Sequence, residues 1–184
     1  MSRSTIMLGL LAAALVAVPQ GADAQSRPQT RDGFFIGFGV GGGTFGCSVC
    51  GTEREGSLTG HLKLGGTVSP RLLLGVESSA WTKEEGGVRL THGNVSALAQ
   101  FYPSATAGFY LSGGVGLSRL AVDVSGGGGT VTVTENGLGL TAGLGYDVRL
   151  GTNFSLTPYG LFGWGDFEGG SADTFQLGLG VTWH

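Results

Sequence analysis

Apolar residues alternate with glycine, serine and threonine along most of the chain, with the two-residue period that side chains have in a β-strand. The pattern predicts eight strands, at 34–41, 57–68, 72–81, 94–102, 109–118, 137–148, 154–165 and 174–183. It is clearest in the sixth segment, where leucines and a tyrosine share one face and glycines and a threonine share the other. The facing of the seventh segment stays ambiguous, because Pro158 interrupts it.

The connections between these segments alternate between two kinds. Short turns are expected at 69–71, 102–108 and 149–153, and longer charged or glycine-rich loops at 44–56, 82–87, 122–136 and 166–173. Short turns at one end and long loops at the other are typical of an up-and-down bacterial outer-membrane barrel. The sequence therefore predicts an all-β fold, an eight-stranded antiparallel up-and-down barrel with both termini periplasmic and the long loops outside.

The two faces of the strands favour a transmembrane barrel over a soluble one. A soluble barrel would enclose the large apolar side chains, although eight strands leave an interior that side chains only just fill. In a transmembrane barrel the apolar face meets lipid, the small and polar face fills the interior, and closure pairs every backbone polar group. A lipocalin-like secreted barrel is the alternative.

The N-terminus has the three regions of a secretory signal: Arg3 in a short polar start, the apolar run 6–18, and the cleavage site Ala22-x-Ala24. The mature chain would begin at Gln25. The apolar run is shorter than the roughly 20 residues that a membrane-spanning helix needs. The expected division of the chain is a signal peptide at 1–24, a short N-terminal extension at 25–32 and the barrel at 33–184.

Composition narrows the function classes. Of the 184 residues, 38 are glycine and 12% are charged, against about 25% charged in an ordinary soluble domain. The net charge is −3, so the chain lacks the basic surface that binds nucleic acid through its phosphates. We expect neither a nucleic-acid partner nor a cofactor.

Three local features add to the strand pattern. They are 144–148 running into a short turn, 155–159 after that turn, and the apolar residues of the final strand, Phe175, Leu177, Leu179, Val181 and Trp183. With these features the chain resembles the small eight-stranded outer-membrane barrels of OmpA/OmpX type, described as the outer membrane protein β-barrel domain, over nearly all of 33–184. The family usually ends on an aromatic residue, whereas here His184 follows Trp183.

The resemblance implies a place in the Gram-negative outer membrane, in contact with lipid and lipopolysaccharide. It also implies that the final strand is a C-terminal assembly signal, which the barrel-assembly machinery reads during insertion. Members of the family include adhesins, small pores, purely structural barrels and a few lipid-modifying enzymes.

Lys63 and Glu77 both fall on the inward face of their strands. Val68 and Leu72 both point outward, so the turn between them must hold an odd number of residues, most simply the three at 69–71. That turn places Lys63 directly opposite Glu77 near mid-membrane, with Cβ atoms about 5 Å apart. We interpret the two as an interior ion pair; the alternative is an electrostatic gate in a narrow pore.

The same pairing places His61 opposite Ser79, with Glu77 diagonal to His61. These residue types occur together in some outer-membrane lipid A deacylases, so a lipid-modifying enzyme is a remote alternative. However, the group faces the lumen, whereas an acyl chain would arrive from the lipid side, and Lys63 competes for Glu77. Interior hydrogen bonds explain His61 and Ser79 better, and no catalytic residue is predicted.

Cys47 and Cys50 lie in the first long loop, and export would place them in an oxidising compartment. We expect them to form a small disulfide ring that stiffens the loop. A metal site is not expected, because zinc needs about four ligands and the chain has only 3 histidines, widely spread.

The long loops are acidic. Nine carboxylates stand against Arg54 and Lys83: Glu53, Glu55, Glu84, Glu85, Asp123, Glu135, Asp166, Glu168 and Asp173. Solvation explains this charge, and divalent-cation bridging to lipopolysaccharide is the alternative. Taken together, the sequence predicts a non-enzymatic integral outer-membrane barrel that contributes to envelope structure or surface interaction. A narrow, porin-like pore for small solutes or ions is the alternative function.

Overall fold

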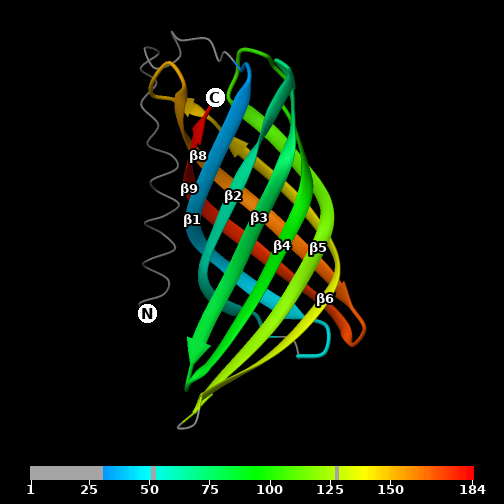
Figure 1. Ribbon diagram of the computed structural model, residues 1–184. Helices are drawn as coiled ribbons and strands as arrows, with labels where there is room; N and C mark the ends of the chain where they lie inside the picture. Colours follow the sequence, from blue (N-terminus) through cyan, green and yellow to red (C-terminus); the bar gives the residue numbers. More distant parts are fainter. Residues whose placement is uncertain (1–30, 51–52, 127–128) are drawn as a thin grey trace.

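The computed structural model describes residues 31–50, 53–126 and 129–184. Within them the chain forms eight long strands and one short one (Figure 1): β1 Phe34–Cys47, β2 Glu55–Ser69, β3 Leu72–Glu85, β4 Val88–Phe101, β5 Phe109–Gly126, β6 Gly129–Tyr146, β7 Val148–Arg149, β8 Phe154–Phe167 and β9 Gly170–Trp183. The predicted signal peptide at 1–24 and most of the extension at 25–32 lie outside the described residues. In the described part, no helix is long and apolar enough to cross a membrane.

The sheet closes on itself to form a barrel (Figure 1). The strands follow one another in the order β6-β5-β4-β3-β2-β1-β9-β8, and β8 also pairs with β6. Every pairing is antiparallel. The short β7 pairs with β8 and continues the wall that β6 begins. The predicted eight-stranded antiparallel barrel is confirmed.

The barrel has two unlike ends. At the end called here the terminal end, Ile36 near the start of β1 pairs with Trp183 at the end of β9, and the turns after β2, β4 and β7 lie there too. The opposite end, called the hairpin end, carries the β1–β2, β3–β4, β5–β6 and β8–β9 connections. Both ends of the described chain therefore lie at the terminal end, and their periplasmic placement stays a prediction.

The connections at the hairpin end are shorter than predicted. β5 and β6 run through most of the expected loop 122–136, and β8 and β9 leave only Glu168 and Gly169 of the expected loop 166–173. In 122–136 the reason is that valine and threonine, which favour strands, continue the alternation into a segment that glycine and charge had marked as a loop.

The expected loop 82–87 is instead a tight hairpin. Gly86 and Gly87 have φ values of 59° and 81°, and Glu85 pairs with Val88 on either side of them. Two consecutive positive φ values match the type I′ turn, whose twist fits antiparallel strands. Glycine adopts this conformation without the steric cost that a Cβ atom brings.

The turn between β2 and β3 also differs from its prediction. Ser69 pairs with Leu72, so only Pro70 and Arg71 lie between the strands, and the register shifts between Thr67 and Ser69. A bulge at this point inserts one extra residue into β2. Because of this extra residue, the rest of β2 pairs with β3 as it would across a three-residue turn. The inward faces of the two strands therefore still match.

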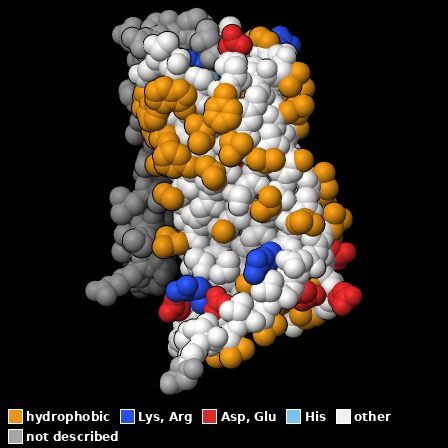
Figure 2. Space-filling view, viewed as in Figure 1, with side chains coloured by type: hydrophobic (Ala, Val, Ile, Leu, Met, Phe, Trp, Pro, Cys, Tyr) orange, Lys and Arg blue, Asp and Glu red, His pale blue; other side chains and the backbone are white. Residues whose placement is uncertain are grey.

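The outer wall of the barrel is apolar and the inner wall is small and polar. Leu58 is 75% exposed, whereas its neighbour Thr59 is 6% exposed. The predicted facing holds for the seven segments in which it was assigned, and in β8 the odd-numbered residues, among them Thr157 and Tyr159, point inward. Figure 2 shows apolar side chains over the wall toward the terminal end and most of the visible charges toward the hairpin end.

Aromatic side chains gather on the outer wall near the terminal end. The register pairs Phe109 with Tyr146 and Phe154 with Trp183. Three of these four, Phe109, Tyr146 and Trp183, are exposed, as are Phe34 and Phe101. On β9, outward apolar residues continue from Trp183 to Phe175, a span that matches the 9–11 residues of a transmembrane strand. An apolar band with an aromatic girdle is typical of transmembrane barrels.

Candidate functional site

The centre of the barrel contains a layer of buried charged and polar side chains. Lys63 on β2 is 2% exposed and Glu77 on β3 is 5% exposed, and the register places them opposite each other. The Lys63 ammonium does not form an ion pair with Glu77. It donates hydrogen bonds to Gln100 Oε1 at 2.8 Å and to the Tyr110 hydroxyl at 3.4 Å.

The expected interior ion pair is therefore wrong as a direct contact, although the two residues are neighbours. The physical reason is that the lumen is narrow, so β4 and β5 bring Gln100 and Tyr110 within reach of the long lysine side chain. The ammonium also lies 4.4 Å from the centre of the Tyr110 ring, where the negative face of an aromatic ring attracts a cation.

A second buried carboxylate, Asp147, is linked to Lys63 through hydrogen bonds. Gln100 accepts from Lys63 and donates to the Tyr102 hydroxyl. That hydroxyl donates in turn to Asp147 Oδ2 at 2.7 Å, and the Thr157 hydroxyl donates to Asp147 Oδ1 at 2.7 Å. This network runs from the middle of the barrel to the terminal end. Sequence reasoning missed it, because its members come from four separate segments and only the closed barrel brings them together.

The Asp147 carboxyl lies between β6 and β7, at the terminal end. Burial acts to raise its pKa, but His184 and Lys63 act in the opposite direction and hold the pKa below its usual value. His184 Nε2 lies 3.7 Å from Asp147 Oδ2. Asp147 therefore carries its negative charge in the network, opposite the Lys63 ammonium.

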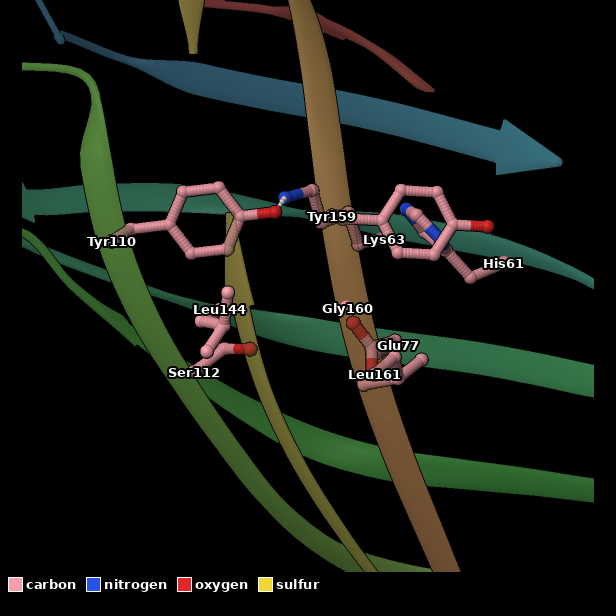
Figure 3. A pocket seen from close by; sticks show the side chains of 9 residues that line it. All are labelled: His61, Lys63, Glu77, Tyr110, Ser112, Leu144, Tyr159, Gly160 and Leu161. Atoms are coloured by element: carbon pink, nitrogen blue, oxygen red, sulfur yellow. Dashed lines mark hydrogen bonds between the residues drawn. The ribbon is translucent and has the colours of Figure 1, made fainter. Parts of the chain in front are cut away.

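A small cavity lies beside Lys63 and Glu77 (Figure 3). Its volume is about 10 Å³, about what one water molecule needs. The His61 and Tyr159 rings pack in a T-shaped arrangement, with an interplanar angle of 90° and ring centroids 4.2 Å apart. Neither Glu77 Oε1 nor His61 Nδ1 has a hydrogen-bond partner.

His61 and Ser79 do not form the arrangement that an acyl-transfer site needs. The register pairs them, yet His61 packs against Tyr159 and its Nδ1 is not hydrogen-bonded to the serine. A serine nucleophile is activated by a base within about 3 Å. The described residues also contain no group of three or more His, Cys, Asp or Glu side chains that could hold a metal ion.

The terminal end of the barrel is closed by an aromatic and aliphatic cluster. Phe35, Leu73, Leu98, Tyr102 and Tyr110 form it. Arg31 lies over this cluster with its guanidinium carbon 3.4 Å from the centre of the Tyr102 ring. Its guanidinium donates to the backbone carbonyls of Ala105 and Ala107 at 3.1 and 2.6 Å. Sequence reasoning missed Arg31, since nothing local distinguishes it within the extension at 25–32.

The hairpin end is closed by a second cluster. Phe45 and Trp81 stack with ring centroids 5.0 Å apart, and Ala172, Leu90 and Phe167 pack around them. Cys47 and Cys50 form a disulfide in the adjoining loop. The two clusters close the lumen on both sides of the polar layer.

Three basic residues of the hairpin end are paired with its carboxylates. Lys83 lies 2.5 Å from Glu55 and 3.0 Å from Glu85. Arg54 pairs with Asp173. A third basic residue, Arg89, which the sequence analysis left out of the loop charge, lies 2.7 Å from Glu84. The surface there remains acidic, because carboxylates outnumber these cations.

Comparisons with solved structures support the architecture. The chain superimposes on Neisserial surface protein A with a TM-score of 0.59 and 17% identity, over 84% of this chain and 99% of the other. It superimposes on Ail of Yersinia pestis, in complex with the heparin analogue sucrose octasulfate, with a TM-score of 0.61 and 15% identity, over 84% of this chain and all of the other (100%). The chain has the fold of the small outer-membrane β-barrels. No protein-family model and no curated protein matches its sequence.

Within this outer-membrane barrel fold, the distinguishing features are on the inside. The polar layer lies between two closing clusters, and its charges are held by hydrogen bonds rather than exposed to a channel. The arrangement can stabilise the barrel, with an apolar cluster on each side of the polar layer.

Proposed function

We propose that the protein is a non-enzymatic integral outer-membrane barrel with a closed lumen, which contributes to envelope structure or surface interaction. The observation that carries this proposal is the closure of the interior at both ends, by the cluster around Phe35 and Tyr102 and by the Phe45–Trp81 stack. The apolar outer wall supports residence in a membrane. In this placement the terminal end is periplasmic and the hairpin end faces outward, toward lipopolysaccharide.

The alternative function, a narrow pore, has less support. The cavity beside Glu77 measures only about 10 Å³, and an apolar cluster lies on each side of the polar layer. Binding of a sulfated polysaccharide, suggested by the ligand of the Ail complex, is also disfavoured here, because carboxylates outnumber cations at the hairpin end and would repel sulfate groups. The final strand, Phe175 to Trp183, remains our candidate for the signal read by the assembly machinery.

The first prediction concerns location. Expressed protein should fractionate with the outer membrane and migrate faster on gels when unheated, because the hydrogen-bonded ring of strands in a closed barrel resists detergent until it is boiled. Recovery in the soluble periplasmic fraction would contradict the membrane placement and favour a secreted barrel.

The second prediction concerns conduction. The refolded protein in planar lipid bilayers should give no stepwise conductance, because two packed clusters cross the lumen. A variant with Phe45→Ala and Trp81→Ala serves as the control for one cluster and should remain closed at the other. Discrete, reproducible conductance steps from the unmodified protein would support the pore instead.

A further inference from the structure

Part of the barrel wall protrudes at the hairpin end. In this part the apolar residues lie on the inner side of the strands instead of the outer side. On β5, Val115 and Leu117 are exposed on the outer wall, but beyond Ser118 the apolar residues are even-numbered, as at Val122 and Val124. The β4–β5 and β5–β6 registers contain no shift, so these even-numbered residues lie on the inner side. The sequence there builds an amphipathic sheet with a polar outer side, which is unsuited to lipid.

The inner side of this sheet is exposed. We call it the valine face; it consists of Val88, Val124, Val131 and Val133. Val131 and Val133 are the most exposed of them, at 67% and 66%. At its base lie Leu90 and Leu120, against the Phe45–Trp81 cluster. Figure 1 shows β3 to β6 reaching beyond the other strands at this end, so the valine face stands clear of the opposite wall.

One edge of the same sheet is open. Among the described residues, β6 pairs with β8 only from Leu138 onward, whereas β5 accompanies β6 all the way to Gly129. The segment 129–136 therefore presents a strand edge with unpaired backbone groups beside the valine face. Such an edge can accept an additional strand.

The rim of the valine face is acidic. Glu135 and Glu168 lie on the β6 side, and the backbone N–H of Gly169 donates to Glu135 at 3.4 Å. On the β3 side, Lys83 is held between Glu55 and Glu85. A second copy of the chain would bring the same negative rim against this one, and anionic lipid would be repelled as well. Charge complementarity favours a cationic occupant.

We propose that the valine face and the adjoining edge of β6 dock an extended polypeptide segment of a partner protein, with alternating apolar side chains and basic flanks. The apolar side chains would cover Val131 and Val133, the backbone would pair with 129–136, and the flanks would meet Glu135 and Glu85. The inference rests on the proposed placement of the protein in the outer membrane with the hairpin end outward, and the fractionation experiment tests the membrane location independently.

The experiment uses the full mature chain refolded in detergent micelles and a fluorescein-labelled nonapeptide of alternating valine and threonine between paired lysines. Fluorescence anisotropy should show saturable binding above that to empty micelles. Val131→Thr with Val133→Thr preserves side-chain shape and strand propensity but removes apolar contact, and it should weaken binding about 10-fold. The matched control, Thr132→Ser with Thr134→Ser on the outer side, should change binding less than about 2-fold.

Charge supplies a second readout. The same peptide with glutamate flanks should bind at least about 10-fold more weakly, and added salt should weaken the lysine-flanked peptide. Heat-modifiable migration of each variant verifies that it is folded. The proposal is overturned if the lysine-flanked peptide binds no better than to empty micelles, if the two valine replacements leave its affinity unchanged, or if cross-linking shows instead a homodimer that depends on Val131.

Discussion

Replacing Lys63 with Met should lower the free energy of unfolding by about 3–5 kcal/mol, the range found when one partner of a buried charged network is removed. The ammonium is almost wholly buried and donates to Gln100 and Tyr110. Its removal leaves the buried Glu77 without the cation opposite it and takes from Asp147 one of the charges that stabilise it. Urea unfolding in detergent or lipid measures the loss, and Lys83→Met at the exposed hairpin end is the matched control, expected to change stability little.

Glu77→Gln should cost less than Lys63→Met, about 1–3 kcal/mol. The reason is that Lys63 keeps its hydrogen bonds and its link to Asp147 when Glu77 loses its charge. In the double variant neither charge of the neighbouring pair remains, so a double-mutant cycle should give a coupling above about 0.5 kcal/mol. Equal losses in the two single variants would mean that Lys63 and Glu77 form a direct ion pair, and a smaller coupling would mean that water screens them.

The architecture could be predicted from sequence because it depends on one repeated local property. Alternation fixes which residues face lipid, and parity across the β2–β3 turn fixes that Lys63 stands opposite Glu77. That register survives even though the turn is shorter than expected, because the bulge near Val68 compensates for the missing residue. Strand facing is thus a stronger constraint than turn length.

The partners of Lys63 could not be predicted in the same way. Register names the residue directly across a hairpin, but an eight-stranded interior is narrow enough for a lysine to reach strands that are not its neighbours. Gln100 and Tyr110 become partners only when β4 and β5 curve around the lumen. Arg31 shows the same limit, since its contacts at Ala105 and Ala107 are far away in sequence.

The hairpin end was misread for a different reason. Glycines and acidic residues in 122–136 suggested a loop, yet β5 and β6 continue there with valines on the opposite side of the strand from the lipid-facing residues. The apolar residues move to the other face of the strand while the two-residue period continues. This indicates that the strand enters different surroundings, not that it ends. The same reversal is the signal that could have revealed the valine face.

Gly65→Ala should lower the free energy of unfolding by about 3 kcal/mol or prevent folding, at the upper end of the usual cost of overpacking. Gly65 faces inward on β2, directly opposite Gly75 on β3. A Cβ atom at Gly65 would overlap the carbonyl oxygen of Leu74 and lie 2.6 Å from Gly75 Cα and 2.8 Å from Phe35 Cε1. Two of these atoms belong to the paired backbone, so relief requires the strands to move apart.

The adjacent glycine provides the control for this prediction. Gly66 faces outward, and the nearest atom to a Cβ there is the Gly33 carbonyl oxygen at 3.9 Å, so Gly66→Ala should change stability by less than about 0.5 kcal/mol. Both variants restrict the unfolded chain equally. A difference between their urea midpoints therefore reports the effect of the strand face on which the new methyl group lies. If both variants were tolerated alike, the interior would be wider than the packed clusters around Phe35 indicate, and the closed lumen on which the proposed function depends would be in question.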